Sequence, residues 1–228
     1  MKWRIAACAA LVAVLLWPVR TVAQKDQAER IRASMTVFDE IMRAPDKAVP
    51  NTYLKKAEAI VVFPTTIKGG LGVGVHRGHG ILSVRDPKTS TWSPPAFMTI
   101  TGGSIGAQIG LEEVDIVLIV LNQRGIESLL SNKFKIGADA AVAAGPVGRD
   151  AEASTDIQLR AQILSYSRTR GLFAGATLKG SAITSDGDAN RDFYGRRLST
   201  SQIVYEGIGS TVEPVPEWNA MLKKYFPS

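Results

Sequence analysis

The sequence predicts an α+β fold, in which a curved, barrel-like antiparallel sheet is joined to helices at both ends of the chain. Short β-branched runs alternate with glycine-rich turns between residues 60 and 178, which is typical of antiparallel strands. Apolar residues recur at steps of three or four in segments 25–43 and 216–226, as they do in amphipathic helices. The 228-residue chain is long enough to bury one substantial core.

Residues 1–23 have the order of a cleavable secretory signal. A basic start precedes an unbroken apolar run over residues 5–17, which is followed by the small residues Thr21 and Ala23. As a helix the run would rise about 20 Å, less than the roughly 30 Å hydrocarbon core, so a cleaved signal is favoured over an anchor. We therefore expect an exported protein, most simply periplasmic, whose mature domain is residues 24–228.

Cysteine usage and charge exclude several classes of function. Cys8 is the only cysteine and precedes the apolar run, whereas a lipoprotein acylation box has its cysteine after such a run. Cleavage after Ala23 would remove it, and with it any disulfide, thiol nucleophile or thiolate metal site. The 27 basic residues, less three in the signal, leave 24 against 21 acidic, a net charge of +3. These charges are scattered without a recognition motif, so nucleic acid is not an expected partner.

The first predicted helix, residues 25–43, carries its apolar residues on one face and is stopped by Pro45. That face either packs against the sheet or lies in a membrane interface. A second, short helix is expected at 51–57, running directly into the first strand. The apolar face consists of Ala28, Ile31, Met35, Phe38 and Ile41.

Beyond Gly69 a series of short strands is predicted, beginning with a glycine-rich hairpin. Glycines inside these strands indicate bulges or sharp coiling, as a strongly curved sheet requires. Short helices are expected at 126–130 and 188–194. The predicted strands are residues 60–63, 71–77, 80–85, 96–101, 114–121, 140–144, 163–167 and 172–178.

Residues 102–106 match the G-x-S-x-G nucleophile elbow of α/β-hydrolases, with Ser104 as the nucleophile. That motif joins a strand to a helix, and the catalytic histidine follows the serine. Here His76 and His79 both precede Ser104, and glycines follow where the helix should begin. A serine hydrolase is therefore only a remote alternative.

His76 and His79 are also the candidate zinc ligands. Residues three apart on a strand point to opposite faces, and no third ligand is suggested nearby, so we place these histidines in a turn instead.

A series of oxygen-bearing residues resembles the start of a calcium-binding loop. Arg191 and Arg197 stand where such a loop needs glycine and glutamate, so a helix cap within residues 185–188 is favoured. The series is Asp186, Asp188, Asn190 and Asp192.

Taken in order, several segments resemble the SYLF domain family. They span nearly all of the chain after the signal, and the G-x-S-x-G match lies inside the longer G-x-S-x-G-x-Q-x-G pattern of that family. No catalytic role is implied for it there. The segments are 57–64 (AEAIVVFP), 68–70 (KGG) with the glycines at 72, 74, 78 and 80, 92–97 (WSPPAF), 102–110 (GGSIGAQIG), 115–118 (DIVL), 145–149 (GPVGR), 166–167 (YS), 171–175 (GLFAG), and Asn190 with 194–195 (YG).

The resemblance implies a non-enzymatic, lipid-binding protein of the bacterial envelope that needs no cofactor. Eukaryotic members are associated with phosphoinositide membranes and fungal members with actin, while bacterial members are exported and regarded as lipid-binding. Actin is not an expected partner for an exported bacterial protein. A phospholipid membrane surface is the expected partner.

Five basic residues are expected to contact anionic headgroups. Lys55, Lys56 and Lys68 bracket the first strand, and Arg30 and Arg32 lie on the first helix. An exposed lysine near an anionic leaflet contributes about 1 kcal/mol, screened within a Debye length. Two alternatives stay open: these residues form an ordinary solvated face, or the protein is an envelope scaffold that binds a protein partner.

Overall fold

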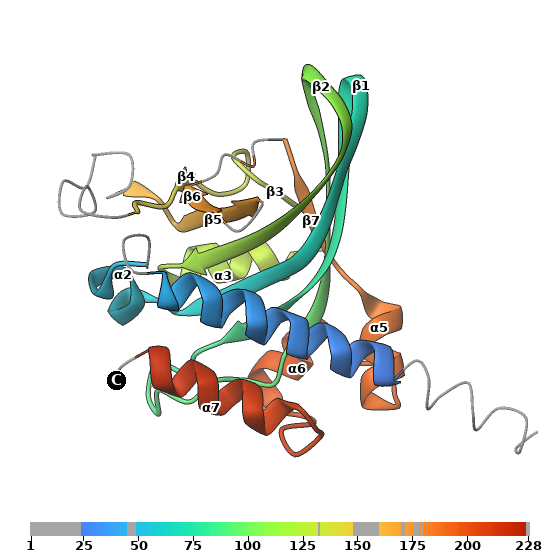
Figure 1. Cartoon of the computed structure of the whole chain (residues 1–228). Coiled ribbons are helices and arrows are strands. Elements are labelled where there is room, and N and C mark those ends of the chain that lie inside the picture. The colour runs from blue at the N-terminus through green and yellow to red at the C-terminus, as the bar shows by residue number, and fades with distance from the viewer. Residues whose placement is uncertain are drawn as a thin grey trace, which may run out of the picture.

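Two very long strands form the centre of the fold (Figure 1). Strand β1 is Ala59–Val84 and strand β2 is Ala96–Val120. They pair antiparallel along almost their whole length, from Ala59 opposite Val120 to Leu82 opposite Ala96. The computed structural model describes residues 24–44, 49–131, 133–147, 160–169, 172–175, 178 and 180–226, so the expected signal, with Cys8, lies outside the described residues.

The other strands attach to the two ends of β2. Residues 98–101 of β2 pair with β7, and residues 115–120 pair with β5. Every described pairing between the strands is antiparallel except that of β4 with β5, which is parallel, as is an isolated bridge between Ile136 and Ala140. The predicted α+β fold with a curved sheet is confirmed, with this one parallel pair added. The remaining strands are β3 (Phe134–Lys135), β4 (Val142–Ala144), β5 (Ile163–Thr169), β6 (Leu172–Gly175) and β7 (Ala182–Ser185).

Helices cover both faces of the sheet, and each face has its own core. The N-terminal helix, α5 and α7 contribute to one core, while α3 and α6 contribute to the other. Within the described residues, none of these helices combines the length and apolar character needed to cross a bilayer. The helices are residues 24–43, α2 (Asn51–Lys56), α3 (Gln123–Leu130), α5 (Gly187–Tyr194), α6 (Thr200–Glu206) and α7 (Val215–Tyr225).

The apolar face of the N-terminal helix lies in the core. Ile31, Phe38 and Ile41 have no exposed surface. The Phe38 ring stacks on Phe226 with centroids 5.4 Å apart and meets Tyr225 edge-on at 5.7 Å. Of the two alternatives for this face, packing within the protein is therefore the correct one, and the face is not free to enter a membrane.

Strand β1 folds back on itself, and glycine makes the close approach of its two arms possible. A Cβ built on Gly80 would lie 2.2 Å from the carbonyl oxygen of Val62, and one on Gly78 would lie 2.3 Å from Oγ1 of Thr66. Where the arms meet, the Arg85 amide donates to the carbonyl of Glu58 at 2.7 Å. The prediction of a glycine-rich hairpin turn is therefore wrong. The glycines instead allow the two arms of one strand to touch.

Two irregularities bend the β1–β2 pair. Near the first, Thr65 has φ of 55°, and its amide donates to Oδ1 of Asp115 at 2.9 Å. The second lies between Leu71 and Val73. Bulges of this kind bend and twist a sheet, which confirms the predicted curvature.

Gly80→Ala is expected to lower the free energy of unfolding by about 1–3 kcal/mol, because the methyl group would displace the Val62 backbone. Urea denaturation followed by circular dichroism measures this. The matched control is Gly187→Ala in α5, where a Cβ would meet nothing within 4 Å, so no loss is expected. If Gly80→Ala were as stable as the wild type, the close approach would not constrain the fold.

Candidate functional site: the projecting ribbon and the basic end

The part of the β1–β2 pair that lacks a third strand projects from the body of the protein (Figure 1). In the described part of the chain β7 pairs with β2 only up to Thr101, and β5 pairs only from Asp115 onward. We call the segment between these limits, residues 66–76 with residues 102–114, the ribbon. A strand pair without side neighbours leaves its outer edges without strand partners, so the ribbon is the first candidate site.

The far part of the ribbon contains no charged residue. We call residues 69–75 of β1 and 102–111 of β2 the apex. Charged residues begin immediately beyond it: Lys68 stands opposite Glu112 on one arm, and Arg77 follows His76 on the other. The sequence therefore changes sharply from uncharged to charged at the same level on both arms.

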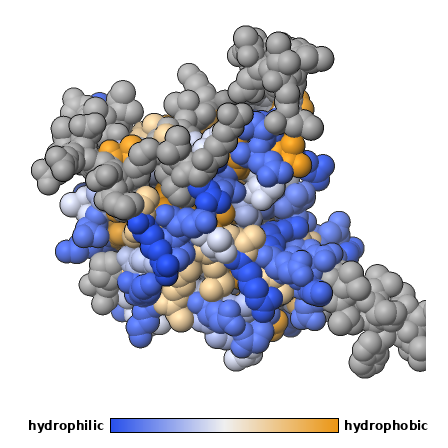
Figure 2. Space-filling view, viewed as in Figure 1, coloured by the Kyte–Doolittle hydropathy of each residue, from blue (hydrophilic) through white to orange (hydrophobic). Residues whose placement is uncertain are grey.

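The outer face of the ribbon exposes two large apolar side chains. Ile67 is 52% exposed and Val75 is 67% exposed. They alternate with buried Thr66 and His76, so they belong to one face of β1. Figure 2 shows hydrophobic side chains at the surface at this end of the molecule. In the described part of the chain, the other exposed large hydrophobic residue is Tyr205 of α6.

On the inner face, His76 ties the ribbon to the sheet. Its Nε2 lies 2.9 Å from Oγ of Ser181. Its ring lies against Gly102, where a Cβ would come within 2.4 Å of the imidazole. Burial, together with the charge of Lys68, lowers the pKa of His76, so the neutral ring is favoured. The predicted turn is wrong: both histidines lie within the continuous strand β1.

On the outer face, Asp186 joins three elements at the foot of the ribbon. Its Oδ2 lies 3.2 Å from Nη1 of Arg30 and 3.2 Å from Nδ1 of His79. Its Oδ1 accepts the Ala189 amide at 3.1 Å, which confirms the predicted helix cap. Arg30 also lies over the Phe97 ring, 5.4 Å from its centroid. These contacts connect the N-terminal helix, β1 and α5.

Burial alone would raise the pKa of Asp186. The Ala189 amide, Arg30 and His79 together outweigh burial and hold that pKa below its usual value. Among the residues that the structure describes, no three His, Cys, Asp or Glu side chains gather closely enough to hold a metal ion.

A second ionic network fixes the other arm. Arg168 of β5 donates from Nε to Oδ2 of Asp115 at 2.6 Å and also pairs with Glu40 of the N-terminal helix. Asp115 also holds the bulge at Thr65. The N-terminal helix is therefore ionically linked to both arms of the long strand pair.

The five predicted lipid-binding residues lie in different settings. Lys55 and Lys56 are exposed in the last turn of α2, and Arg32 is exposed on the N-terminal helix. Arg30 is engaged by Asp186. Lys68 lies nine residues beyond the start of β1, about 30 Å along an extended strand, so it belongs to the ribbon rather than to α2.

Basic residues also end α7, and sequence reasoning missed them. Lys223 and Lys224 are exposed, and the Phe38–Phe226 stacking holds this end of α7 against the N-terminal helix. Figure 1 shows α2 at the same end of the molecule. We call Lys55, Lys56, Lys223 and Lys224 the basic end; none of them forms an ion pair with a described residue.

Ser104 lies inside the continuous strand β2, opposite Gly74. No strand-to-helix turn follows it, so the backbone geometry of a nucleophile elbow is absent from this position. The hydrolase alternative loses its structural basis.

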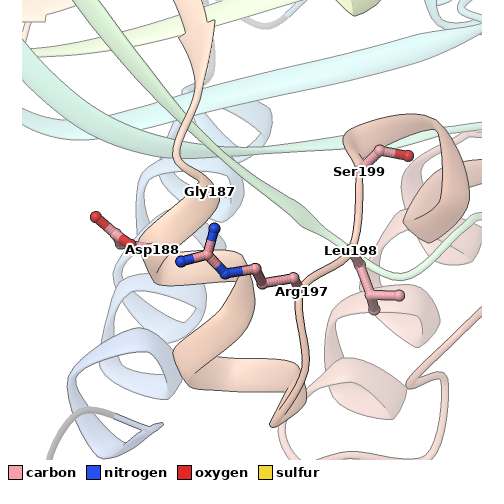
Figure 3. A pocket seen from close by; sticks show the side chains of 5 residues that line it. All are labelled: Gly187, Asp188, Arg197, Leu198 and Ser199. Atoms are coloured by element: carbon pink, nitrogen blue, oxygen red, sulfur yellow. The ribbon is translucent and has the colours of Figure 1, made fainter.

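A shallow hollow of about 390 Å³ lies beside the start of α5 (Figure 3). Asp186 and Ser199 already cap α5 and α6, and Asp188 pairs with Arg191 at 2.9 Å. The hollow therefore offers a ligand little beyond the Arg197 side chain, and we assign it no function. Its lining is Gly187, Asp188, Arg197, Leu198 and Ser199.

Comparison with known proteins identifies the family. The family model described as "Ysc84: Las17-binding protein actin regulator" matches residues 101–225, more than half of the chain. The chain belongs to the Ysc84 family. The resemblance to SYLF domains is thereby confirmed, and the matched segment includes most of β2 and everything after it in the fold.

Relatives in the Ysc84 family come from distant organisms. "LAS seventeen-binding protein 3" of Saccharomyces cerevisiae is 32% identical over 185 residues, covering 80% of this chain and 40% of the yeast protein. "SH3 domain-containing YSC84-like protein 1" of Homo sapiens is 32% identical over 193 residues, covering 83% and 55%. The Xenopus laevis protein of that name is 32% identical over 180 residues, covering 78% and 53%. The chain thus spans about half the length of these relatives.

Asp186→Ala is expected to lower the free energy of unfolding at pH 7 by about 2 kcal/mol, because it removes a helix cap and leaves Arg30 without its partner. The folded-state pKa of Asp186 is lowered, so its contribution is present above the unfolded-state pKa near 4 and is lost as pH falls through the folded-state pKa. Urea denaturation between pH 7 and pH 3 should show the two proteins converging.

The matched control for that series is Asp188→Ala, on the same helix. Asp188 is 82% exposed and pairs only with Arg191 among the ion pairs of the described residues, so little change is expected at any pH. A difference between wild type and Asp186→Ala that stayed constant down to pH 3 would contradict the ionic role of Asp186.

Proposed function

We propose that this Ysc84-family protein binds phospholipid at a membrane surface, without catalysing a reaction, in the periplasm or an equivalent exported space. The observation that carries the proposal is the basic end: four exposed lysines at the C-terminal ends of α2 and α7, without carboxylate partners among the described residues. Each contributes about 1 kcal/mol toward an anionic leaflet when it lies near the surface. Arg32 and Lys68 add positive charge elsewhere on the protein.

An ordinary structural role explains part of this pattern. Lysines in the last turn of a helix complement the negative end of its dipole. That role does not require the ends of different helices to lie at the same end of the protein. Here the Phe38–Phe226 contact holds the end of α7 against the N-terminal helix, on the side where α2 lies (Figure 1). Lys224 also donates to the Tyr225 hydroxyl at 3.2 Å, but no described carboxylate pairs with any of the four lysines. Anionic headgroups are the chemistry that such a group of exposed cations would attract.

A protein partner is the second candidate function. Strand β1 has β2 as its one strand neighbour in the described part of the sheet, and such an edge can accept an added strand. The yeast relative's name states that it binds another protein. Salt-insensitive capture of one defined envelope protein, without vesicle binding, would favour this candidate.

Lys55→Glu with Lys56→Glu is expected to weaken binding to vesicles of 70% phosphatidylcholine and 30% phosphatidylglycerol at least tenfold at low salt. The cause is the loss of two attractive charges and the gain of two repulsive ones. Co-sedimentation of residues 24–228 measures the binding, since every core residue in the described part lies between 31 and 226.

The matched control is Lys25→Glu with Arg196→Glu. It changes the net charge equally, and both residues are exposed near the start of the N-terminal helix, where Gln24 contacts Phe193 of α5. Equal weakening by both double variants would indicate a general charge effect and contradict a role for the basic end. Absence of any wild-type binding to vesicles would contradict the proposed function itself.

A further inference from the structure

We infer that the ribbon is a membrane-anchoring element, whose apex and outer face enter the interfacial layer of a phospholipid bilayer. This inference rests on the proposed function and adds to it the part of the protein that leaves water. Headgroup attraction at the basic end and apolar contact at the ribbon contribute separately to the free energy of membrane binding. Salt screens the first contribution but not the second.

The first argument is the exposure of apolar side chains. The described body of the protein buries its large hydrophobic residues in two cores and leaves three substantially exposed. Two of the three, Ile67 and Val75, lie on the same face of the ribbon, on either side of its bend. Two large apolar residues exposed on one face of a projecting element make that face a candidate contact surface.

The second argument is the distribution of charge along the ribbon. From the bend near residue 72, the first charged side chain on each arm is Lys68 or Arg77, about 13–17 Å away along an extended strand. Amphipathic elements bury their apolar side about 5–10 Å into the boundary between headgroups and acyl chains. Insertion to that depth would leave Lys68, Arg77 and the opposing Glu112 in the polar layer, together with Ile67 beside Lys68, while Val75, about 10 Å from the bend, would reach the boundary with the acyl chains.

The third argument limits how deeply the ribbon can enter the bilayer and favours the interfacial layer over the hydrocarbon core. Pairing between β1 and β2 satisfies the backbone groups between the strands, but the outer edges of the ribbon have no described strand partner. Such edges are excluded from hydrocarbon and tolerated where headgroups and water accept hydrogen bonds. The foot of the ribbon is fixed by the His76–Ser181 contact and by the Asp186 network, which gives the apex a defined direction.

The test places an environment-sensitive fluorophore (NBD) on a cysteine at position 75, using Val75→Cys in residues 24–228, which contain no other cysteine. On vesicles of 70% phosphatidylcholine and 30% phosphatidylglycerol we expect a blue-shifted, brighter emission that lipids with bromine in the acyl chain quench. The control is Tyr205→Cys with the same label; Tyr205 is 55% exposed on α6, outside the ribbon, so no shift is expected.

A second pair of variants measures the energetic role. Val75→Asp should weaken vesicle binding roughly tenfold at high salt, where headgroup attraction is screened, while Tyr205→Asp should not. Circular dichroism checks that both variants are folded.

The outcomes separate this inference from the proposed function. Vesicle binding by the wild type with no change at the position-75 label would overturn the inference and leave the proposed function standing. No vesicle binding at all would overturn both. A blue shift that grows with protein concentration in the absence of vesicles would overturn the inference in favour of self-association through the ribbon.

Discussion

The contact between the two arms of β1 is the constraint on which the rest of the structure depends. Gly80 lies so close to the Val62 carbonyl that no side chain fits between them, and the strand's two ends meet at Glu58 and Arg85. Because β2 follows β1 along its whole length, it must bend at the same place. One folded strand pair therefore creates two sheet edges, to which β5 and β7 attach, and leaves its own bend as a projection.

Ion pairs of the N-terminal helix stabilise the folded strand pair. The N-terminal helix reaches one arm through Arg30 and Asp186 and the other through Glu40 and Arg168. Its apolar face packs against the core, with Ile31, Phe38 and Ile41 fully buried and Ala28 and Met35 partly buried, so the helix holds the two arms in place rather than contacting a membrane. Two features remain for a partner: the exposed lysines of the basic end, which form no ion pair with a described residue, and the uncharged apex. Our proposals use these two features.

Local patterns predicted the helices well and the long strands poorly. Apolar periodicity placed the N-terminal helix and α7, and the short helices α2, α3 and α5 were also expected. The Asp186 cap followed from its side-chain chemistry, while α6 was missed. Gly78 and the glycines of 102–110 fell outside the predicted strands, because a glycine at a turn and one at a close backbone contact have the same sequence signature. The ribbon was missed for that reason, although the uncharged stretch from 96 to 111 could have indicated it. The lysines of the basic end could not be grouped from the sequence, because only tertiary packing brings the ends of α2 and α7 to the same side of the protein.

Hydrogen–deuterium exchange of residues 24–228, with and without vesicles of phosphatidylcholine and phosphatidylglycerol, tests the central claim most directly. If the folded strand pair presents its apex to the membrane, exchange should slow in peptides covering 69–75 and 102–111, with little change in the N-terminal helix, residues 24–43. Slower exchange in the N-terminal helix, with an unaffected apex, would contradict the account.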